Sequence, residues 1–492
     1  MGLPIERERF TAEEFALFTE RLSASLEALR ALLERPSFGR GAPTIGAEVE
    51  MHLVDVHAEP LPENAAVLAL ADDPRVTLEI NRFNLEVNAP PCTLRGRPFA
   101  ALRRELADAL SVVQRAAEQK QARIALIGIL PTLRVAHLAE GVLSDAPRYR
   151  ALSGALRRMR GEPFSVHIRG RETLSAECDD VALEGANASF QVHLRSEPAS
   201  FAKLFNAAQL AAGPLLAATS NSPFFDAKCL WAETRIALFQ QAVDTRVDAR
   251  ERARLPSRVS FGRGFIRDAY EPFAENVALH TALLPVLTDE DPLAVVQAGG
   301  VPRLEELRLH HGTVWDWNRA VFDPQDGGHL RIEHRLLPSG PTLSDMVANA
   351  ALTLGLTLGL APRMEQLARS FPFAAAADNL YAAARHGLEA QLLWPGEPGE
   401  PARPRSAREL LLELLPLAEQ ALCDAGVERS DLRELFTCLH ERISSGRTGA
   451  ALQRALVARH EPTLGRERAL VTMLESYLDW SARDIPVHRW EC

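Results

Sequence analysis

The sequence predicts an α+β fold with one largely antiparallel sheet, covered by helices on one face and polar on the other, and a helical C-terminal region. Four segments alternate apolar and polar side chains with the two-residue period of a strand, at residues 44–55, 76–91, 185–196 and 329–340. Helical periodicity occupies much of the chain between them and almost all of it after residue 342. Antiparallel sheets commonly bury one face and leave the other accessible, so the polar faces are candidates for a functional floor.

The first strand has the most unusual polar face. Glu48 and Glu50 lie on the same side of the strand, together with His52, and the intervening residues are apolar. Two carboxylates on one face repel each other, so the arrangement requires a compensating cation or a set of arginines. A bound divalent metal is one interpretation, and a solvated face beside basic residues of a neighbouring strand is the alternative.

The other three strands repeat this pattern. The second presents Glu86 and Asn88 on one face, and the third presents Gln191 and His193 on a face without lysine or glutamate. The fourth places Glu333 beside basic residues. Hard oxygen and imidazole donors predict a site for two or three Mg²⁺ or Mn²⁺ ions, with the ligands Glu48, Glu50, Glu86, His193 and Glu333.

Arginines are the expected partners of an anionic substrate at this floor, and the candidates are Arg235, Arg246, Arg319 and Arg335. Carboxylate-bound metals beside fixed arginines form an environment that holds a triphosphate and neutralises a phosphoryl group in transfer. The chain has no GxxxxGK[ST] loop and no GxGxxG turn after a strand, which argues against the common loop-based nucleotide sites. Surface ion pairs are the alternative explanation for any single arginine.

Composition limits the other classes of function. The 492 residues carry a net charge of -10, and the 55 lysines and arginines are scattered, so we expect neither a nucleic-acid partner nor a membrane surface. The six cysteines lie far apart and form no CxxC pair, which favours reduced thiols. With a charged N-terminus and no run of about 18 apolar residues, the chain is expected to be cytoplasmic.

Several motifs, in order, resemble the glutamate–cysteine ligase and carboxylate–amine ligase family. They are GAEVEMHLVD, NLEVNAPP, SFQVHL, NSPFF followed by a helical arginine, AVDTR and RIEHRLLPSGPTLSD, between about residues 40 and 391. The resemblance implies a glutamine-synthetase-like catalytic fold and an ATP- and Mg²⁺-dependent ligase. Such an enzyme phosphorylates a carboxylate, typically the γ-carboxylate of glutamate, and an amine then attacks the acyl phosphate. Cysteine is the first candidate amine, and other small-molecule amines remain open.

The resemblance also implies roles for individual residues. The five candidate ligands above correspond to the family's metal-binding set, and Arg235 and Arg335 to its anion-binding arginines. Arg319 resembles a further substrate or phosphate arginine. The residues expected to contact nucleotide or substrate are Gln191, Asn88 and Arg246. The chain departs from the family pattern after its buried apolar segment, where GILPTL stands in place of a Gly-x-His-Pro turn.

Four regions are expected along the chain. Thr11 and Glu14 form a capping-box signal ahead of an amphipathic helix. A Pro- and Gly-rich break, PGEPGEPARPRS, indicates a linker near the C-terminal helices. The expected regions are an N-terminal helix that packs on the catalytic domain, the ligase catalytic domain, the linker and a helical C-terminal region, at residues 1–40, 41–394, 395–406 and 407–492.

Three other functions use similar residues. A metal-dependent hydrolase could activate water with the same Glu and His cluster, but its arginines would then be idle. A non-catalytic relative could keep the fold and bind a partner through the C-terminal helices. An enzyme that transfers a phosphoryl group to a guanidine could use the same sheet and arginines, but its product would be a phosphorylated guanidine and not an amide. The oligomeric state is left open.

Overall fold

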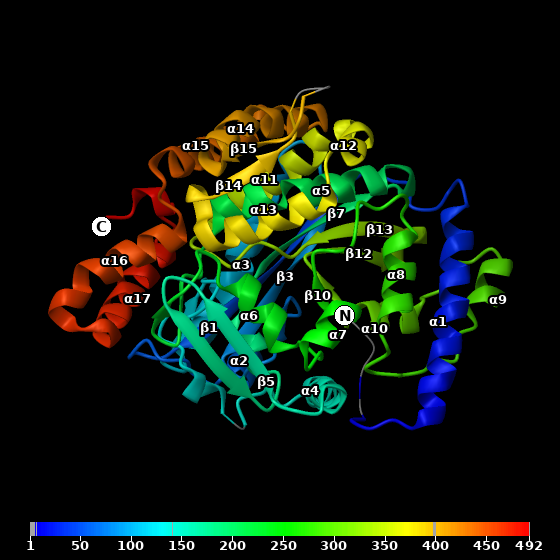
Figure 1. The fold of residues 1–492 in the computed structure, drawn as a ribbon, viewed down its shortest axis with the longest axis horizontal. Coiled ribbons are helices and arrows are strands. Elements are labelled where there is room, and N and C mark those ends of the chain that lie inside the picture. The colour runs from blue at the N-terminus through cyan, green and yellow to red at the C-terminus, as the bar shows by residue number, and fades with distance from the viewer. Residues whose placement is uncertain (1–4, 6, 140, 397–399, 492) are drawn as a thin grey trace.

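A seven-stranded sheet forms the centre of the computed structural model, which describes residues 5, 7–139, 141–396 and 400–491 (Figure 1). The strand order is β12, β13, β7, β1, β3 and β2, and β4 also pairs with β1. Every pairing in this sheet is antiparallel. The bounds are β1 (Thr44–Val54), β2 (Val76–Leu78), β3 (Asn84–Thr93), β4 (Arg123–Ala125), β7 (Phe190–Ser196), β12 (Asn318–Asp323) and β13 (His329–His334). The predicted α+β class is confirmed.

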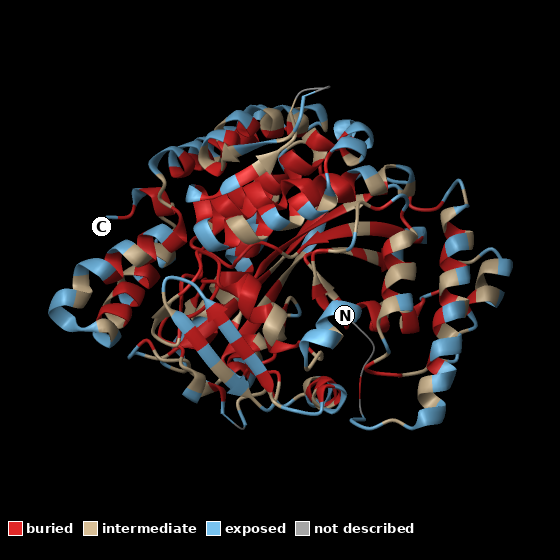
Figure 2. Ribbon diagram, in the orientation of Figure 1, coloured by how far each residue is buried: buried red, intermediate tan, exposed pale blue. Residues whose placement is uncertain are grey.

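Helices cover the apolar face of this sheet. α3 packs on β1 and β3, while α11 contacts β7 and α5 contacts β13. Ala47, Val49 and Met51 of β1 are buried on this side. Figure 1 shows α13, α14 and α15 outside α5 and α11, and most residues of α5 and α11 are buried (Figure 2). The opposite, polar face is therefore the one left for a site.

The helices span most of the chain. Their bounds are α1 (Ala12–Leu33), α2 (Asn64–Ala71), α3 (Pro98–Glu118), α4 (Pro147–Arg160), α5 (Pro198–Thr219), α6 (Arg235–Ala242), α7 (Ala249–Arg254), α8 (Glu271–Leu279), α9 (Pro292–Gln297), α10 (Glu305–His311), α11 (Leu343–Leu360), α12 (Met364–Ser370), α13 (Phe373–His386), α14 (Ala407–Asp424), α15 (Arg429–Ser445), α16 (Gly449–Leu464) and α17 (Arg466–Ala482). α1 begins with the predicted capping box at Thr11 and contacts α8, α9 and α10.

Short two-stranded ladders surround the main sheet. They pair β5 (Phe164–Arg169) with β6 (Thr173–Cys178), β8 (Phe224–Phe225) with β9 (Lys228–Cys229), β10 (Val259–Ser260) with β11 (Trp315–Asp316), and β14 (Gln391–Trp394) with β15 (Arg403–Ser406). β15 uses part of the predicted linker, and residues 397–399 of that linker lie outside the described residues. The four regional boundaries stay predictions.

α11 is the most apolar helix of the layer. The stretch Leu343–Ser370 is long and apolar enough to cross a membrane, but 78% of its most apolar window is buried inside the fold. The polar side chains of Asp345 and Asn349 lie within this apolar helix and are themselves fully buried. The burial is that of a core helix.

Asp345 also ties α11 to the C-terminal helices. Its Oδ1 accepts a hydrogen bond from Arg442 Nη2 at 2.7 Å, and its Oδ2 accepts one from the backbone N–H of Val487 at 3.0 Å. We expect Asp345→Asn to leave the Arg442 charge buried and uncompensated, which lowers the free energy of unfolding by about 3–5 kcal/mol in a urea titration. Asp479→Asn, which breaks an exposed pair with Arg123, is the matched control and should cost under about 1 kcal/mol. Equal losses in the two variants would contradict this assignment.

Candidate active site

The strand register gathers the predicted polar side chains on one patch of the sheet. Glu48 of β1 lies opposite Asn88 of β3 on one side and Gln191 of β7 on the other. His193 of β7 lies opposite Glu333 of β13. Directly opposed residues of neighbouring strands project from the same face. Four strands, β1, β3, β7 and β13, thus supply adjacent side chains.

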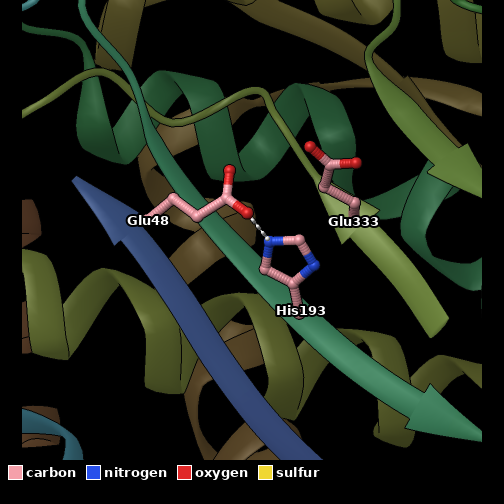
Figure 3. Close-up of side chains that lie close together, drawn as sticks. All are labelled: Glu48, His193 and Glu333. Atoms are coloured by element: carbon pink, nitrogen blue, oxygen red, sulfur yellow. Dashed lines mark ion pairs between the residues drawn. The ribbon is translucent and has the colours of Figure 1, made fainter. Parts of the chain in front are cut away.

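Glu48, His193 and Glu333 form the tightest group. One ligand atom of each residue lies within 4.8 Å of the others, and Figure 3 shows the three side chains converging from β1, β7 and β13. His193 Nε2 lies 3.1 Å from Glu48 Oε1. Glu333 is fully buried, and His193 is 7% exposed. The group therefore lies at the base of the polar face and not at its rim.

Two arginines hold Glu333. Arg319 Nε donates to Glu333 Oε2 at 2.5 Å, and Arg335 Nη1 donates to Glu333 Oε1 at 2.5 Å. Arg335 Nη1 also donates to Gln191 Oε1. Burial alone would raise the pKa of Glu333, but the charges of Arg319 and Arg335 outweigh it and hold that pKa well below its usual range. Glu333 is therefore an anion at any physiological pH.

A pocket of about 510 Å³ opens above this patch. Its floor includes seven of the predicted site residues, namely Glu48, Glu50, Glu86, Asn88, Gln191, Arg319 and Arg335. Helices α4 and α10 form its walls, with Arg148 and Tyr149 from the first and Arg308 and His311 from the second. His193 and Glu333 do not line the pocket themselves. They contact two residues that do, Glu48 and Arg319 respectively.

Two carboxyl groups that the sequence analysis did not predict, Glu79 and Glu184, join Glu50 and Glu86 on the acidic side of the pocket. Burial raises the pKa of Glu50, against the opposing charge of Arg335. Burial and the charge of Glu48 raise the pKa of Glu86 well above its usual value, and burial and Glu50 do the same for Glu79. Burial raises the pKa of Glu184 to about 8, and the charge of Glu50 adds to it. The protein alone thus supplies too little positive charge for these acids.

This donor set fits divalent metal ions. Neither ring nitrogen of His193 has a hydrogen-bond partner of good geometry among the described residues. Glu50 and Glu86 lie directly opposite each other on β1 and β3, an arrangement that destabilises a sheet without a counter-charge. Carboxylate oxygens with one imidazole are the ligands that Mg²⁺ and Mn²⁺ accept. Such ions would satisfy the histidine and neutralise the acids together.

Two of the predicted arginines, Arg235 and Arg246, do not line the pocket. Arg235, at the start of α6, is buried beneath the site, where it pairs with Glu233 and donates to the carbonyl oxygens of Arg335 and Leu336. Its position holds the segment that carries Arg335. Arg246 follows α6 and binds Asp244 through Nε at 2.7 Å. The anion-binding role of the first and the nucleotide-binding role of the second stay predictions.

Of the two acids that the sequence analysis did not predict, Glu79 could have been found from the sequence pattern and Glu184 could not. Glu79 stands two residues after Thr77, whose hydroxyl donates to Glu86, so the alternation of that segment could have revealed it. Glu184 lies in a 3₁₀ turn, Glu184–Ala186, which has no strand period. His52, placed with Glu48 by alternation, is instead buried against Phe83 and Asn84 beyond the pocket.

The raised pKa of Glu184 predicts a pH dependence of stability. The folded protein holds a proton on this group between the ordinary value of 4.5 and about 8, and the unfolded chain releases it. Without metal, the free energy of unfolding should therefore fall as the pH rises through this window. Because a metal ion competes with the protons, Mn²⁺ should raise the melting temperature more at about pH 8.5 than at about pH 6.

Thermal melts with and without Mn²⁺ measure both trends. Glu184→Gln should make both trends shallower, and the raised pKa values of Glu79 and Glu86 should account for the slope that remains. A metal-free melting temperature that rises with pH across the window would contradict the assignment.

The family comparison decides what kind of protein carries this site. A model described as Glutamate-cysteine ligase family 2 (GCS2) matches residues 44–472. The chain belongs to this family. The match confirms the resemblance read from the motifs and continues past residue 391, where those motifs end, into α17.

Individual relatives agree with the GCS2 assignment. A Rubrobacter xylanophilus protein, provisionally named glutamate–cysteine ligase 2-3, is 28% identical over 431 residues, which are 86% of this chain and 94% of that protein. A Mycolicibacterium smegmatis protein, provisionally named glutamate–cysteine ligase 2-1, is 26% identical over 395 residues, 78% of this chain and 85% of the relative. The crystal structure of a glutamate–cysteine ligase from Francisella tularensis in complex with AMP shares the fold at 10% identity, with a TM-score of 0.51 and coverage of 92% and 96%.

Membership in GCS2 sets the general activity. The chain is an ATP-dependent carboxylate–amine ligase of the glutamate–cysteine ligase type, a class that uses metal ions and small-molecule substrates. The sheet pocket, with its acidic floor and its arginines, is the candidate site for that activity.

Proposed function

We propose that this ligase forms a γ-glutamyl amide from glutamate and an amine, with cysteine the first candidate amine, and that it uses ATP with Mg²⁺ or Mn²⁺. One oxygen of the glutamate γ-carboxylate attacks the terminal phosphorus of ATP, which releases ADP and leaves an acyl phosphate. The amine nitrogen then attacks the acyl carbon, the C–O bond to phosphate breaks, and the amine loses a proton. Such a reaction would serve glutathione biosynthesis in the cytoplasm.

The observation that carries the proposal is the contact of Glu333 with both arginines beside His193 and Glu48. A water-activating hydrolase site needs the acids and the histidine only. Here Arg319 and Arg335 lie in the same pocket, and Glu333 fixes both guanidinium groups through short hydrogen bonds. Fixed guanidinium groups match the charge and geometry of phosphoryl and carboxylate groups. The hydrolase alternative leaves this arrangement unexplained.

Each part of the pocket has a defined task in this proposal. Glu48, His193 and Glu333 would hold one metal ion, and Glu50, Glu86 and Glu79 offer ligands for others. Such ions neutralise the charge of a triphosphate during transfer. Arg335, held by Gln191 and Glu333, positions the transferred phosphoryl group or the substrate carboxylate. Asn88, which binds Glu86 at 2.8 Å, orients that carboxylate.

Substrate-dependent ATP consumption tests the proposal. Purified protein with Mg²⁺, glutamate and a panel of amines headed by cysteine should release ADP and phosphate only when both substrates are present, and mass spectrometry should detect a γ-glutamyl amide. A phosphorylated guanidine would favour the kinase alternative. No ATP turnover by folded, metal-loaded protein with any pair would favour the hydrolase, which needs no nucleotide, or a non-catalytic relative.

A further inference from the structure

A second pocket, separate from the sheet pocket, gathers arginines from three separate elements. It has a volume of about 590 Å³ and lies between the β5–β6 turn, the C-terminal end of α13 and the N-terminal half of α16. None of its lining residues lines the sheet pocket. Its four arginines are Arg169, Arg171, Arg385 and Arg454.

These arginines have no acidic partner among the residues that the structure describes. Elsewhere in the chain many arginines form ion pairs with carboxylates, as Arg466 does with Glu172 and Glu461. Glu389 is the acidic residue that lines this pocket, and Arg408, outside the lining, neutralises it at 2.7 Å. The pocket is therefore strongly positive in a protein whose net charge is -10.

Neutral groups hold the arginines in place. Arg454 Nη2 donates to the carbonyl oxygen of Leu230 at 3.1 Å, and its Nε is buried without a hydrogen-bond partner in the described structure. The guanidinium of Arg385 lies 4.7 Å from the ring centroid of Trp231. Arg169 Nε donates to His167 Nε2 at 3.0 Å. These contacts orient the guanidinium groups and leave their charge uncompensated.

Burial and a neighbouring arginine both disfavour the charged form of Arg454. Burial lowers its pKa, the nearby Cys229 thiol opposes this effect, and the charge of Arg171 adds to the lowering. A bound anion would reverse the repulsion between these two arginines. The β5–β6 turn packs closely on the segment that carries Leu230, since a Cβ atom at Gly170 would lie 2.5 Å from the backbone carbon of Leu230.

We propose that this arginine pocket binds a small organic molecule through a multiply charged oxyanion group, a phosphate or a set of carboxylates. The volume exceeds what a single inorganic anion needs and falls within the range of small-molecule sites. Leu230, Leu388 and the alanines of α16 line the remainder and suit a compact apolar body. Several guanidinium groups on one anion give strong, charge-assisted hydrogen bonds.

The pocket lies next to a segment that reaches the sheet site. Leu230 and Trp231 line the arginine pocket. Four residues after Trp231 the chain reaches Arg235, which donates to the backbone carbonyl oxygens of Arg335 and Leu336. An anion at the arginine pocket would therefore bind beside the support of the sheet site, where an effector of the ligase would act.

Calorimetric titration of the full chain in metal-free buffer tests the proposal, with inorganic pyrophosphate and citrate as separate probes. Without metal, the acidic floor of the sheet pocket disfavours both anions. At least one probe should bind saturably, and Arg454→Met should weaken that binding by about tenfold or more, because a charge-assisted hydrogen bond is lost while the aliphatic stem is kept. Arg385→Met, at an exposed position, should do the same and provides an independent variant if Arg454→Met fails to fold.

Arg459→Met is the matched control, since Arg459 is exposed on the same helix and does not line the pocket. It should leave the affinity unchanged. Binding of pyrophosphate alone would assign a phosphate ligand, binding of citrate alone a polycarboxylate, and binding of both a general oxyanion site. Absence of saturable binding for both probes, or affinities that none of the arginine variants changes, would overturn the proposal. Neither result depends on the ligase reaction.

Discussion

Replacing Glu333 by glutamine is expected to lower the turnover number by about 10³-fold or more. The side chain is fully buried and receives hydrogen bonds from Arg319 and Arg335 on its two oxygens. Glutamine keeps the volume but places an NH₂ group against one of these donors and removes the charge that faces His193. Both the arginine geometry and a metal ligand are lost in one substitution. Steady-state ATP turnover, together with Mn²⁺ binding followed by electron paramagnetic resonance, measures the two consequences.

Asp345→Asn is the control for this variant. It also removes a buried carboxylate that is paired with an arginine, but it lies in α11 and does not line the pocket. We expect it to lower the melting temperature while the turnover number of the folded protein stays close to that of the wild type. If Glu333→Gln retained full activity, or if Asp345→Asn lost as much activity per folded molecule, the central role of the Glu48, His193 and Glu333 cluster would be wrong.

Arg335→Lys is expected to reduce the turnover number by about 10²-fold despite the conserved charge. Arg335 Nη1 donates to both Gln191 and Glu333, and the guanidinium leaves further N–H groups for a substrate anion. The ammonium group of lysine is a compact point charge on a flexible stem and cannot reproduce this planar arrangement. The loss should appear mainly in the turnover number if Arg335 acts on the transferred phosphoryl group, and in the KM for the carboxylate substrate if it holds that carboxylate.

Arg267→Lys supplies the comparison, because the exposed Arg267 pairs with Glu271, four residues later in the chain, and neither residue lines the pocket. Its kinetic constants should not change. An Arg335→Lys enzyme with unaltered turnover number and KM would show that the guanidinium geometry is irrelevant, and the proposed anion-binding role of Arg335 would fall.

Local periodicity accounts for the parts of the site that the sequence predicted. Glu48, Glu50, Glu86, Gln191 and Arg335 project into one pocket because each belongs to, or directly follows, a strand with a two-residue polar period. The register that places His193 opposite Glu333 depends on pairing between distant strands, and the ordered family motifs anticipated it better than any single segment.

Residues without a strand period escaped prediction, or were predicted for the site and do not line the pocket. Glu184 comes from a 3₁₀ turn, and its approach to Glu50 depends on tertiary packing alone. Arg246 folds back onto Asp244, two residues earlier, so a local ion pair occupies it. The residues of β5 also alternate, with Phe164, Val166 and Ile168 buried, but no strand was predicted there because the neighbouring sequence is rich in arginine.

Isotope transfer from the carboxylate substrate tests the central claim most directly. The enzyme would be given glutamate labelled with ¹⁸O in the γ-carboxylate, together with ATP, Mg²⁺ and the amine that supports turnover. If the carboxylate attacks ATP to form an acyl phosphate, one labelled oxygen must leave with the phosphate when the amine attacks, and mass spectrometry should detect ¹⁸O in the released phosphate. Unlabelled phosphate, formed at the same rate as the amide or without any amide, would contradict carboxylate activation at the sheet pocket.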